Sequence, residues 1–263
     1  MKKGFSYILA YLTLGSVILT QAVNGATIDV YANHEYNWNG YMNWFEKTST
    51  GTKGGYVWGS GWGVSDLKTT ITTTSFVLQP NFNTYANNVG GSAADQAYWT
   101  DGAGGGNKWM EAATYIERTG WFHGNLLTFS GNVTGFNLDP GYTAKAYIRG
   151  FVNGYWDTNA NGGTGGWIND VAWGSPVNTF TNLSSTGSFS VSRDFGGANG
   201  FGGTWDDNDI IQYGFLVEGI NGNPANESTL GAVTIASVPE PSSATLLGLG
   251  VAGLLVARLR RRS

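Results

Sequence analysis

The chain has 263 residues, no cysteine and only 12% charged residues. The absence of cysteine excludes disulfide bonds, thiol catalysis and thiolate metal sites. Aromatic residues make up 14% of the chain, which argues against disorder, and the length suits one sizeable core. Between its two ends, the region 27–238 holds eight basic and 17 acidic residues, a net charge of −9. A body of this charge repels phosphate backbones, so we expect no nucleic-acid partner.

The N-terminus predicts a secretory signal peptide over residues 1–26. Lys2 and Lys3 precede an apolar run from about residue 7 to 19, and a segment of small residues ends at Ala26. A positive start, an apolar stretch and a small-residue cleavage region are typical of exported proteins. The alternative is a permanent N-terminal membrane helix, for which the apolar run is short.

Apolar and polar residues alternate with a period of two along residues 27–236, which predicts one all-β domain. We expect strands near 27–31, 41–46, 53–58, 66–73, 75–80, 109–117, 127–133, 144–149, 188–192, 211–218 and 233–235. Half-polar strands favour antiparallel sheets with one wet face, and two such sheets packed together give a jelly-roll-like β-sandwich. No internal repeat supports a propeller.

Tryptophan is the first candidate for a binding residue. The chain has 11 tryptophans, and Trp156, Trp167 and Trp205 lie in probable loops beside small or polar residues. The long loops are expected at 81–107, 153–174 and 194–209. An exposed indole offers an apolar face to a sugar ring, while neighbouring Asn and Asp side chains bond sugar hydroxyls. We therefore expect these three residues to bind carbohydrate; the alternative is that they plug loops onto the sandwich.

Calcium is the only cofactor that the sequence suggests. Asp157, Asn159 and Asn161 stand at alternate positions and a glycine follows, as at the start of a calcium-binding loop. The usual glutamate at the twelfth position is replaced by Ile168, and Asp170 is the nearest substitute. Asn, Asp and Gly also fill ordinary turns for backbone reasons, so a simple turn is the alternative.

Catalytic motifs are few, and we expect a protein that is not an enzyme. Glycoside hydrolysis needs two carboxylates about 5–5.5 Å apart for retention of configuration. Glu111 and Glu117 share a strand face but are about 20 Å apart along it, which excludes them as the pair. Glu111 with Glu218, on different strands, remains the pair for an alternative function as a secreted glycosidase.

The C-terminus joins a proline motif to an apolar segment and a basic end. Residues 237–243 form a linker with the motif, and residues 244–263 form a predicted transmembrane helix with a basic tail. The motif and tail residues are Val238, Pro239, Glu240, Pro241, Arg258, Arg260, Arg261 and Arg262. The arginines favour the cytoplasmic side, which places the body outside the membrane. A single permanent anchor is the alternative.

This segment, from Val238 to Arg262, closely resembles the PEP-CTERM sorting signal of Gram-negative bacteria. The resemblance implies an exported protein that its C-terminal helix holds transiently in the inner membrane. An exosortase-type membrane enzyme then processes it, and the product reaches the cell surface or extracellular matrix. Such proteins accompany exopolysaccharide and biofilm production. We therefore expect a non-catalytic surface or matrix protein that contacts polysaccharide; the alternative is a structural matrix protein without a ligand site.

Overall fold

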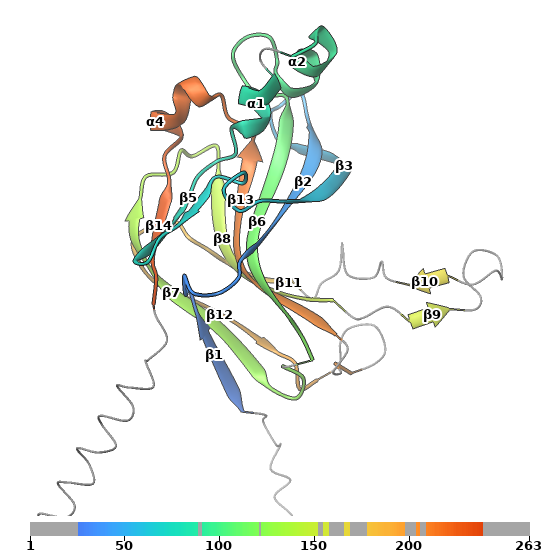
Figure 1. The fold of residues 1–263 in the computed structure, drawn as a ribbon, viewed down its shortest axis with the longest axis vertical. Helices are drawn as coiled ribbons and strands as arrows, with labels where there is room; N and C mark the ends of the chain where they lie inside the picture. The colour runs from blue at the N-terminus through green and yellow to red at the C-terminus, as the bar shows by residue number, and fades with distance from the viewer. Residues whose placement is uncertain are drawn as a thin grey trace, which may run out of the picture.

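The computed structural model describes residues 26–88, 91–120, 122–151, 155–157, 166–168, 178–197, 204–205 and 209–238. Two six-stranded sheets dominate the described chain (Figure 1). Sheet A contains β1 (Thr27–Tyr31), β4 (Thr69–Ile71), β5 (Ser75–Leu78), β7 (Leu126–Phe136), β12 (Gly187–Asp194) and β14 (Val233–Ala236). Sheet B has the order β11 (Asn178–Asn182), β8 (Thr143–Phe151), β13 (Ile210–Ile220), β6 (Lys108–Thr119), β2 (Asn39–Lys47) and β3 (Lys53–Trp62).

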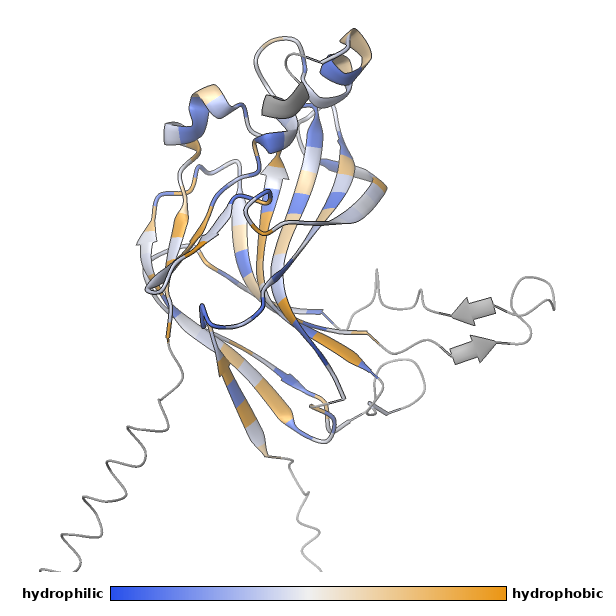
Figure 2. Cartoon of the chain, viewed as in Figure 1, coloured by the Kyte–Doolittle hydropathy of each residue, from blue (hydrophilic) through white to orange (hydrophobic). Residues whose placement is uncertain are grey.

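The two sheets pack face to face around one apolar core. Buried side chains from both sheets form the main cluster, because alternate residues of each strand point inward, and a second cluster gathers around Met42, Trp44 and Met110 of sheet B. The ring of Phe129 in sheet A lies 5.3 Å from that of Phe215 in sheet B and 5.5 Å from that of Tyr213. Apolar and polar residues alternate along the strands in Figure 2. The predicted all-β fold of two packed sheets is confirmed.

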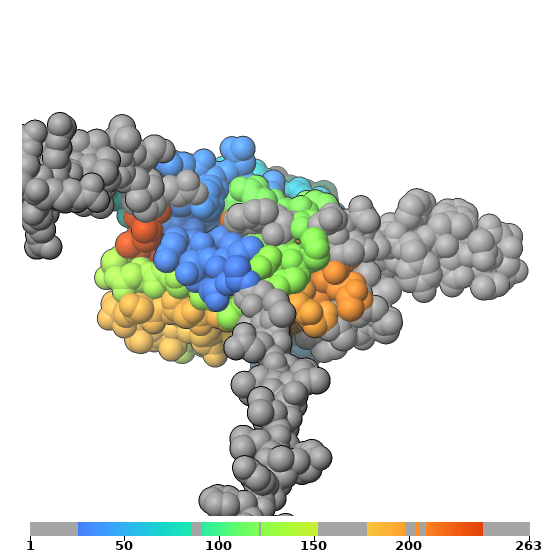
Figure 3. All heavy atoms as spheres, turned by 90° about the horizontal axis from the view of Figure 1, so that it is seen from below, coloured from blue at the N-terminus to red at the C-terminus, as the bar shows by residue number. Residues whose placement is uncertain are grey.

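One strand pair departs from the predicted antiparallel sheets. Strand β1 runs parallel to β7, from Thr27 opposite Leu126 to Tyr31 opposite Ser130. The blue N-terminal residues lie against the green middle segment in Figure 3. After β1 the chain crosses to sheet B and continues as β2, so β1 and β7 are joined by a long connection. A parallel pair needs such a crossover, whereas an antiparallel hairpin does not.

Short helices occupy part of the region that was expected to be a loop at 81–107. They are α1 (Asn83–Asn88) and α2 (Ala93–Trp99). The side chain of Ser92 accepts a hydrogen bond from the backbone N–H of Asp95 and so caps α2. Ser and Asp three positions apart resemble the capping-box pattern, which is the sequence signal for this helix.

Other local differences also come from turns and short elements. The strand expected at 66–73 is reduced to β4, because the backbone N–H groups of Asp66 and Leu67 both bond the carbonyl of Gly63 in a turn. Strand β11 was not predicted, because it is short and mainly polar. The expected loop at 153–174 contains the paired strands β9 (Tyr155–Asp157) and β10 (Gly166–Ile168). A 3-10 turn, η2 (Pro224–Asn226), and helix α4 (Glu227–Leu230) precede β14.

Candidate functional site

The outer face of sheet B, which points away from sheet A, carries four rows of side chains. Because cross-strand neighbours on one face lie close together, the strand register defines each row. Two polar rows enclose two rows that are mainly apolar or aromatic. In order, the rows are Asn43, Glu111, Glu218 and Thr143; Tyr41, Ala113, Leu216 and Lys145; Tyr115, Gly214, Tyr147 and Phe180; and Glu117, Gln212, Arg149 and Asn178.

A groove with a volume of about 570 Å³ is hollowed into this face. Its aromatic lining residues are Tyr41, Phe45, Tyr56 and Phe180. Its polar lining residues are Asn43, Lys53, Glu111, Lys145, Arg149, Asn178 and Glu218. The groove therefore combines exposed rings with hydrogen-bonding and charged groups, which is the composition of a binding site for a polar ligand with an apolar face.

Each glutamate of the groove contacts a lysine. The Glu111 carboxylate accepts a hydrogen bond from the Lys53 ammonium. The Lys145 ammonium donates to Glu218 Oε2 at 2.5 Å, and the Thr143 hydroxyl donates to the same oxygen at 3.0 Å. Glu111 and Glu218 are directly opposite each other on β6 and β13. The centre of the first polar row is therefore a pair of carboxylates flanked by two ammonium groups.

Arg149 has a different environment. Its Nε donates to Asn178 Oδ1 at 2.9 Å, and its guanidinium lies 5.1 Å from the centroid of the Tyr147 ring. Within the described part of the chain, no carboxylate forms an ion pair with it. The guanidinium is thus positioned by an amide and a ring, and its charge is not balanced by a paired carboxylate of those residues.

Asn43 supplies an acceptor to the groove. Its side chain is only 8% exposed, and its Oδ1 has no hydrogen-bond partner among the described residues. The neighbouring strand position is Gly59, where an added Cβ would lie 2.5 Å from that oxygen. Glycine therefore leaves room beside the amide. A buried acceptor without a partner lowers the stability of the folded state.

Three tyrosines lie at the centre of the face: Tyr115 and Tyr147 are buried, and Tyr41 is half-buried. Burial raises the pKa of the Tyr147 hydroxyl, and burial followed by the nearby Glu117 carboxylate raises the pKa of Tyr115. Tyr41 also has a raised pKa, caused by burial and then by Tyr56. All three rings are therefore uncharged near neutral pH. They form an apolar floor between the two polar rows.

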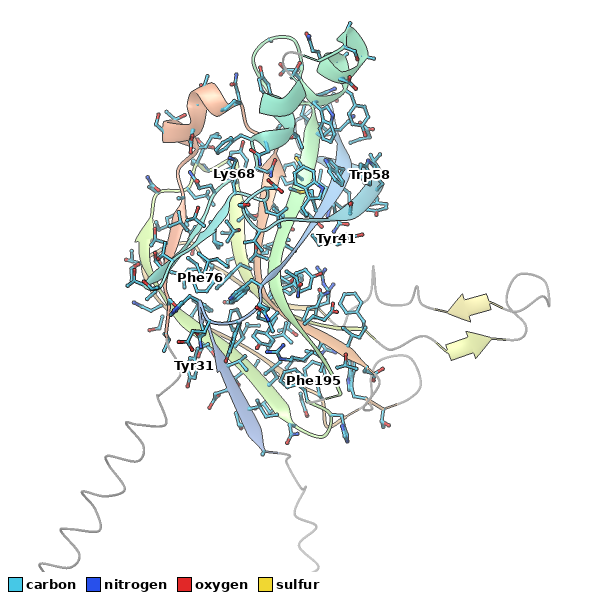
Figure 4. All side chains as sticks on the ribbon, viewed as in Figure 1. Tyr31, Tyr41, Trp58, Lys68, Phe76 and Phe195 are labelled. Atoms are coloured by element: carbon cyan, nitrogen blue, oxygen red, sulfur yellow. The ribbon has the colours of Figure 1, made fainter. Side chains whose placement is uncertain are left out.

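The prediction that Trp205 is an exposed sugar-binding residue is wrong. Its side chain is 4% exposed and belongs to the core, where its ring lies 4.9 Å from that of Phe195 in an edge-to-face contact. Figure 4 shows Phe195 towards the lower end of the body, away from Trp58. The sequence placed Trp205 in a glycine-rich loop, but this loop residue folds onto the inner face of sheet B, where its large apolar ring is removed from water.

The other predicted sites lie mainly outside the described residues. Trp156 and Trp167 face each other in the register of β9 and β10, and their side chains lie outside the described part. The same holds for the side chain of Asp157, and Asn159, Asn161 and Asp170 are also outside it. Within the described ranges, no group of three or more His, Asp or Glu side chains is placed to hold a metal ion. The calcium loop stays a prediction.

The aromatic residues of the groove were not predicted, because they are tyrosine and phenylalanine, whereas the predicted sugar-binding residues were all tryptophans. A signal was present in the stretch from Tyr41 to Phe45. Strand alternation places Tyr41, Asn43 and Phe45 on one face and the buried Met42 and Trp44 on the other. Two tyrosine or phenylalanine rings flanking an asparagine on one face of a strand therefore marked this part of the groove.

The end of the described chain is bonded to the sandwich. The backbone N–H of Ser237 donates to Thr74 O at 2.9 Å, and that of Val238 donates to Ala32 O at 2.7 Å. The Ser237 hydroxyl accepts a hydrogen bond from the backbone N–H of His34 at 3.0 Å. The family model described as "PEP-CTERM protein-sorting motif" matches residues 237–262. The chain carries a PEP-CTERM sorting signal. The motif thus begins at the last residues held by the body.

The PEP-CTERM signal implies an exported protein that is anchored in the membrane before exosortase, a membrane enzyme, processes it. Neither a curated protein nor a solved structure matches the chain. No helix within the described residues is long and apolar enough to cross a membrane. Residues 1–25 of the predicted signal peptide (1–26) and the sorting-signal residues after Val238, including the predicted helix 244–263, lie outside that part.

Proposed function

We propose that the exported body binds polysaccharide through the groove on the outer face of sheet B and is not an enzyme. The observation that carries this proposal is the combination of exposed rings and polar groups on one grooved face. After processing, the protein acts at the cell surface or in the extracellular matrix, where exopolysaccharide is the ligand. Several weak contacts per molecule suffice when many copies bind one polymer.

The exposed rings supply the apolar part of the contact. The side chain of Tyr56 is 61% exposed and that of Phe180 is 40% exposed, and they lie on the outermost strands of sheet B. A pyranose ring presents a face of C–H groups, and burying about 100 Å² of apolar surface stabilises a complex by about 2–3 kcal/mol. The polar groups that line the groove, such as the Asn178 side chain, then bond sugar hydroxyls between these rings.

The test is a binding assay of the purified body, residues 27–238, against a panel of polysaccharides. We expect Tyr56→Ala and Phe180→Ala each to weaken binding at least tenfold, because each removes a stacking surface. Phe136→Ala is the matched control, since Phe136 is an exposed phenylalanine on sheet A. Binding to no polysaccharide would contradict the proposal and favour a structural matrix protein without a ligand site.

Glycoside hydrolysis is the second candidate, and the strand register is the observation that favours it. Directly opposed residues have Cβ atoms about 4.5–5.5 Å apart, which suits the carboxylate spacing of a retaining glycosidase. Glu111 and Glu218 occupy such positions in the groove. Both carboxylates contact lysine ammonium groups, however, whereas hydrolysis requires one carboxyl that donates a proton. For this reason we place binding first.

Release of reducing sugar from the same panel tests the second candidate. If Glu111 and Glu218 act as the catalytic pair, Glu111→Gln and Glu218→Gln each abolish the release. Glu117→Gln is the control, because Glu117 lies on the same face but outside the pair. Absence of reducing sugar with every polymer dismisses hydrolysis and leaves the binding proposal intact.

A further inference from the structure

We infer that the groove prefers polysaccharides whose sugars carry carboxylate groups, namely polymers of uronic acids. This inference rests on the proposed function and adds the chemical class of the ligand. It follows from three observations: the charge of the groove compared with the rest of the body, the unbalanced charge of Arg149, and the position of Arg149 relative to the exposed ring of Phe180.

The groove gathers positive charge in a body that is otherwise acidic. Three of the eight basic residues of the region 27–238 line it, namely Lys53, Lys145 and Arg149. They face two acidic residues there, Glu111 and Glu218, whereas the region as a whole has 17 acidic residues. The groove therefore has a net positive charge, whereas the body as a whole has a net negative charge. An anionic polymer is repelled by the body in general and attracted at the groove.

Arg149 is the source of the excess charge. Each lysine of the groove is paired with a glutamate, whereas Arg149 has no carboxylate partner among the described residues. Asn178 uses only the Nε of Arg149, and within the described residues no hydrogen bond of the terminal N–H groups is present, which makes them available to a ligand there. A guanidinium bonds a carboxylate through two parallel hydrogen bonds, and these are stronger than bonds between neutral groups.

The ring of Phe180 lies near Arg149, so one sugar residue can contact both side chains. Asn178 and Phe180 are two positions apart on β11, so both lie on the outer face. Asn178 is opposite Arg149 in the strand register. Residues two positions apart along a strand are about 7 Å apart, which is within reach of an arginine side chain. A sugar residue stacked on Phe180 can therefore place its carboxylate at Arg149. A uronic acid has both required parts, an apolar ring face and a carboxylate.

The experiment compares polygalacturonate with the same polymer after complete methyl esterification, which neutralises the carboxylates and keeps the sugar ring. We expect the purified body to bind polygalacturonate at least tenfold more tightly than the ester. Arg149→Gln should remove this preference, so that the polymer and its ester bind equally, because glutamine carries no charge to pair with a carboxylate. Arg118→Gln is the control for charge, because Arg118 is exposed and does not line the groove. Circular dichroism and the melting temperature confirm that each variant is folded.

The variant Arg149→Lys tests whether the carboxylate is bound by two parallel hydrogen bonds from the guanidinium or only by its positive charge. The structure predicts that lysine restores only part of the preference, because it cannot form two parallel bonds. Dextran sulfate and polyglutamate complete the panel. If dextran sulfate binds more tightly than polygalacturonate, the preferred anionic group is a sulfate and not a carboxylate. Equal or tighter binding of polyglutamate would overturn a polysaccharide ligand in favour of an acidic polypeptide.

Two results distinguish failure of this inference from failure of the proposed function. Equal binding of polygalacturonate and its ester, or an unchanged preference in Arg149→Gln, overturns the carboxylate preference while polysaccharide binding stands. Binding of no polymer in the panel overturns both.

Discussion

The two faces of sheet B are built on the same strands and have different roles. On β13, Tyr213, Phe215 and Val217 point into the core, whereas Gln212, Leu216 and Glu218 belong to the outer face. The inner face contributes to stability because its side chains are buried against sheet A. The outer face shares the same rigid backbone but keeps charged groups and half-exposed rings. A sheet thus positions a site accurately on one face because the other face is packed.

The largest expected effect is on the inner face. Phe215→Ala should lower the free energy of unfolding by about 3–5 kcal/mol, because it empties a site in which the ring is 1% exposed. Phe180→Ala, on the outer face of the same sheet, should cost less than about 1 kcal/mol, because its ring is already partly in water. Urea unfolding of both variants measures the difference. Equal losses would refute the division of roles between the two faces.

A substitution that adds one carbon tests how tightly the inner face is packed. A Cβ at Gly150 would lie 2.2 Å from the ring of Trp205, so Gly150→Ala should cost about 1–3 kcal/mol of unfolding free energy. Gly197→Ala is the matched control, since no atom lies within 4 Å of an added Cβ there. Thermal melting compares the two variants. If Gly150→Ala is as stable as the control, then Trp205 does not pack against this strand.

Shortening the chain shows where the stable body ends. Ser237 and Val238 make backbone and side-chain hydrogen bonds to Thr74, His34 and Ala32. A body that ends at Ala236 should therefore be about 1.5–4.5 kcal/mol less stable than one that ends at Val238, since each of the three bonds contributes about 0.5–1.5 kcal/mol. Chemical unfolding of the two purified bodies gives this difference. Identical midpoints and slopes would show that the two residues add nothing.

The smallest effect is expected from a buried hydroxyl on the outer face. The Tyr147 hydroxyl has no hydrogen-bond partner within the described chain, so Tyr147→Phe should change stability at pH 7 by no more than about 1 kcal/mol. If the change is larger, a partner for the hydroxyl must exist.

The same variant has a distinct pH dependence. Burial raises the pKa of Tyr147 above the value of 10.0 that describes an unfolded tyrosine. Above pH 10 the folded state therefore binds more protons than the unfolded state. The free energy of unfolding is fully retained below pH 10 and falls as the pH rises beyond it. Tyr147→Phe should reduce this fall, and urea unfolding at pH 9, 10 and 11 measures it. A fall of the same size in both proteins would contradict the burial of this hydroxyl.

Much of the fold was predictable from strand periodicity, because alternate residues must point to opposite faces. The strands around Ile28, Phe129 and Phe215 were expected, and the inward direction of their side chains followed from the pattern. The site was less predictable. Tyr41 and Phe45 were visible as same-face residues but were overlooked in favour of tryptophan. The burial of Trp205 was not predictable, since a residue in a glycine-rich loop carries no local signal of whether it folds back onto the core.

The amino-acid order alone specified the sorting signal from Val238 onward, since a linear motif is read in sequence and needs no folded partner. It also specified the alternation of each strand, which depends only on backbone geometry. The tertiary structure decided which strands are neighbours, and therefore that Glu111 is opposite Glu218 and that Arg149 is beside Asn178. These contacts join residues far apart in the chain, and their register depends on how both sheets bury their apolar faces together.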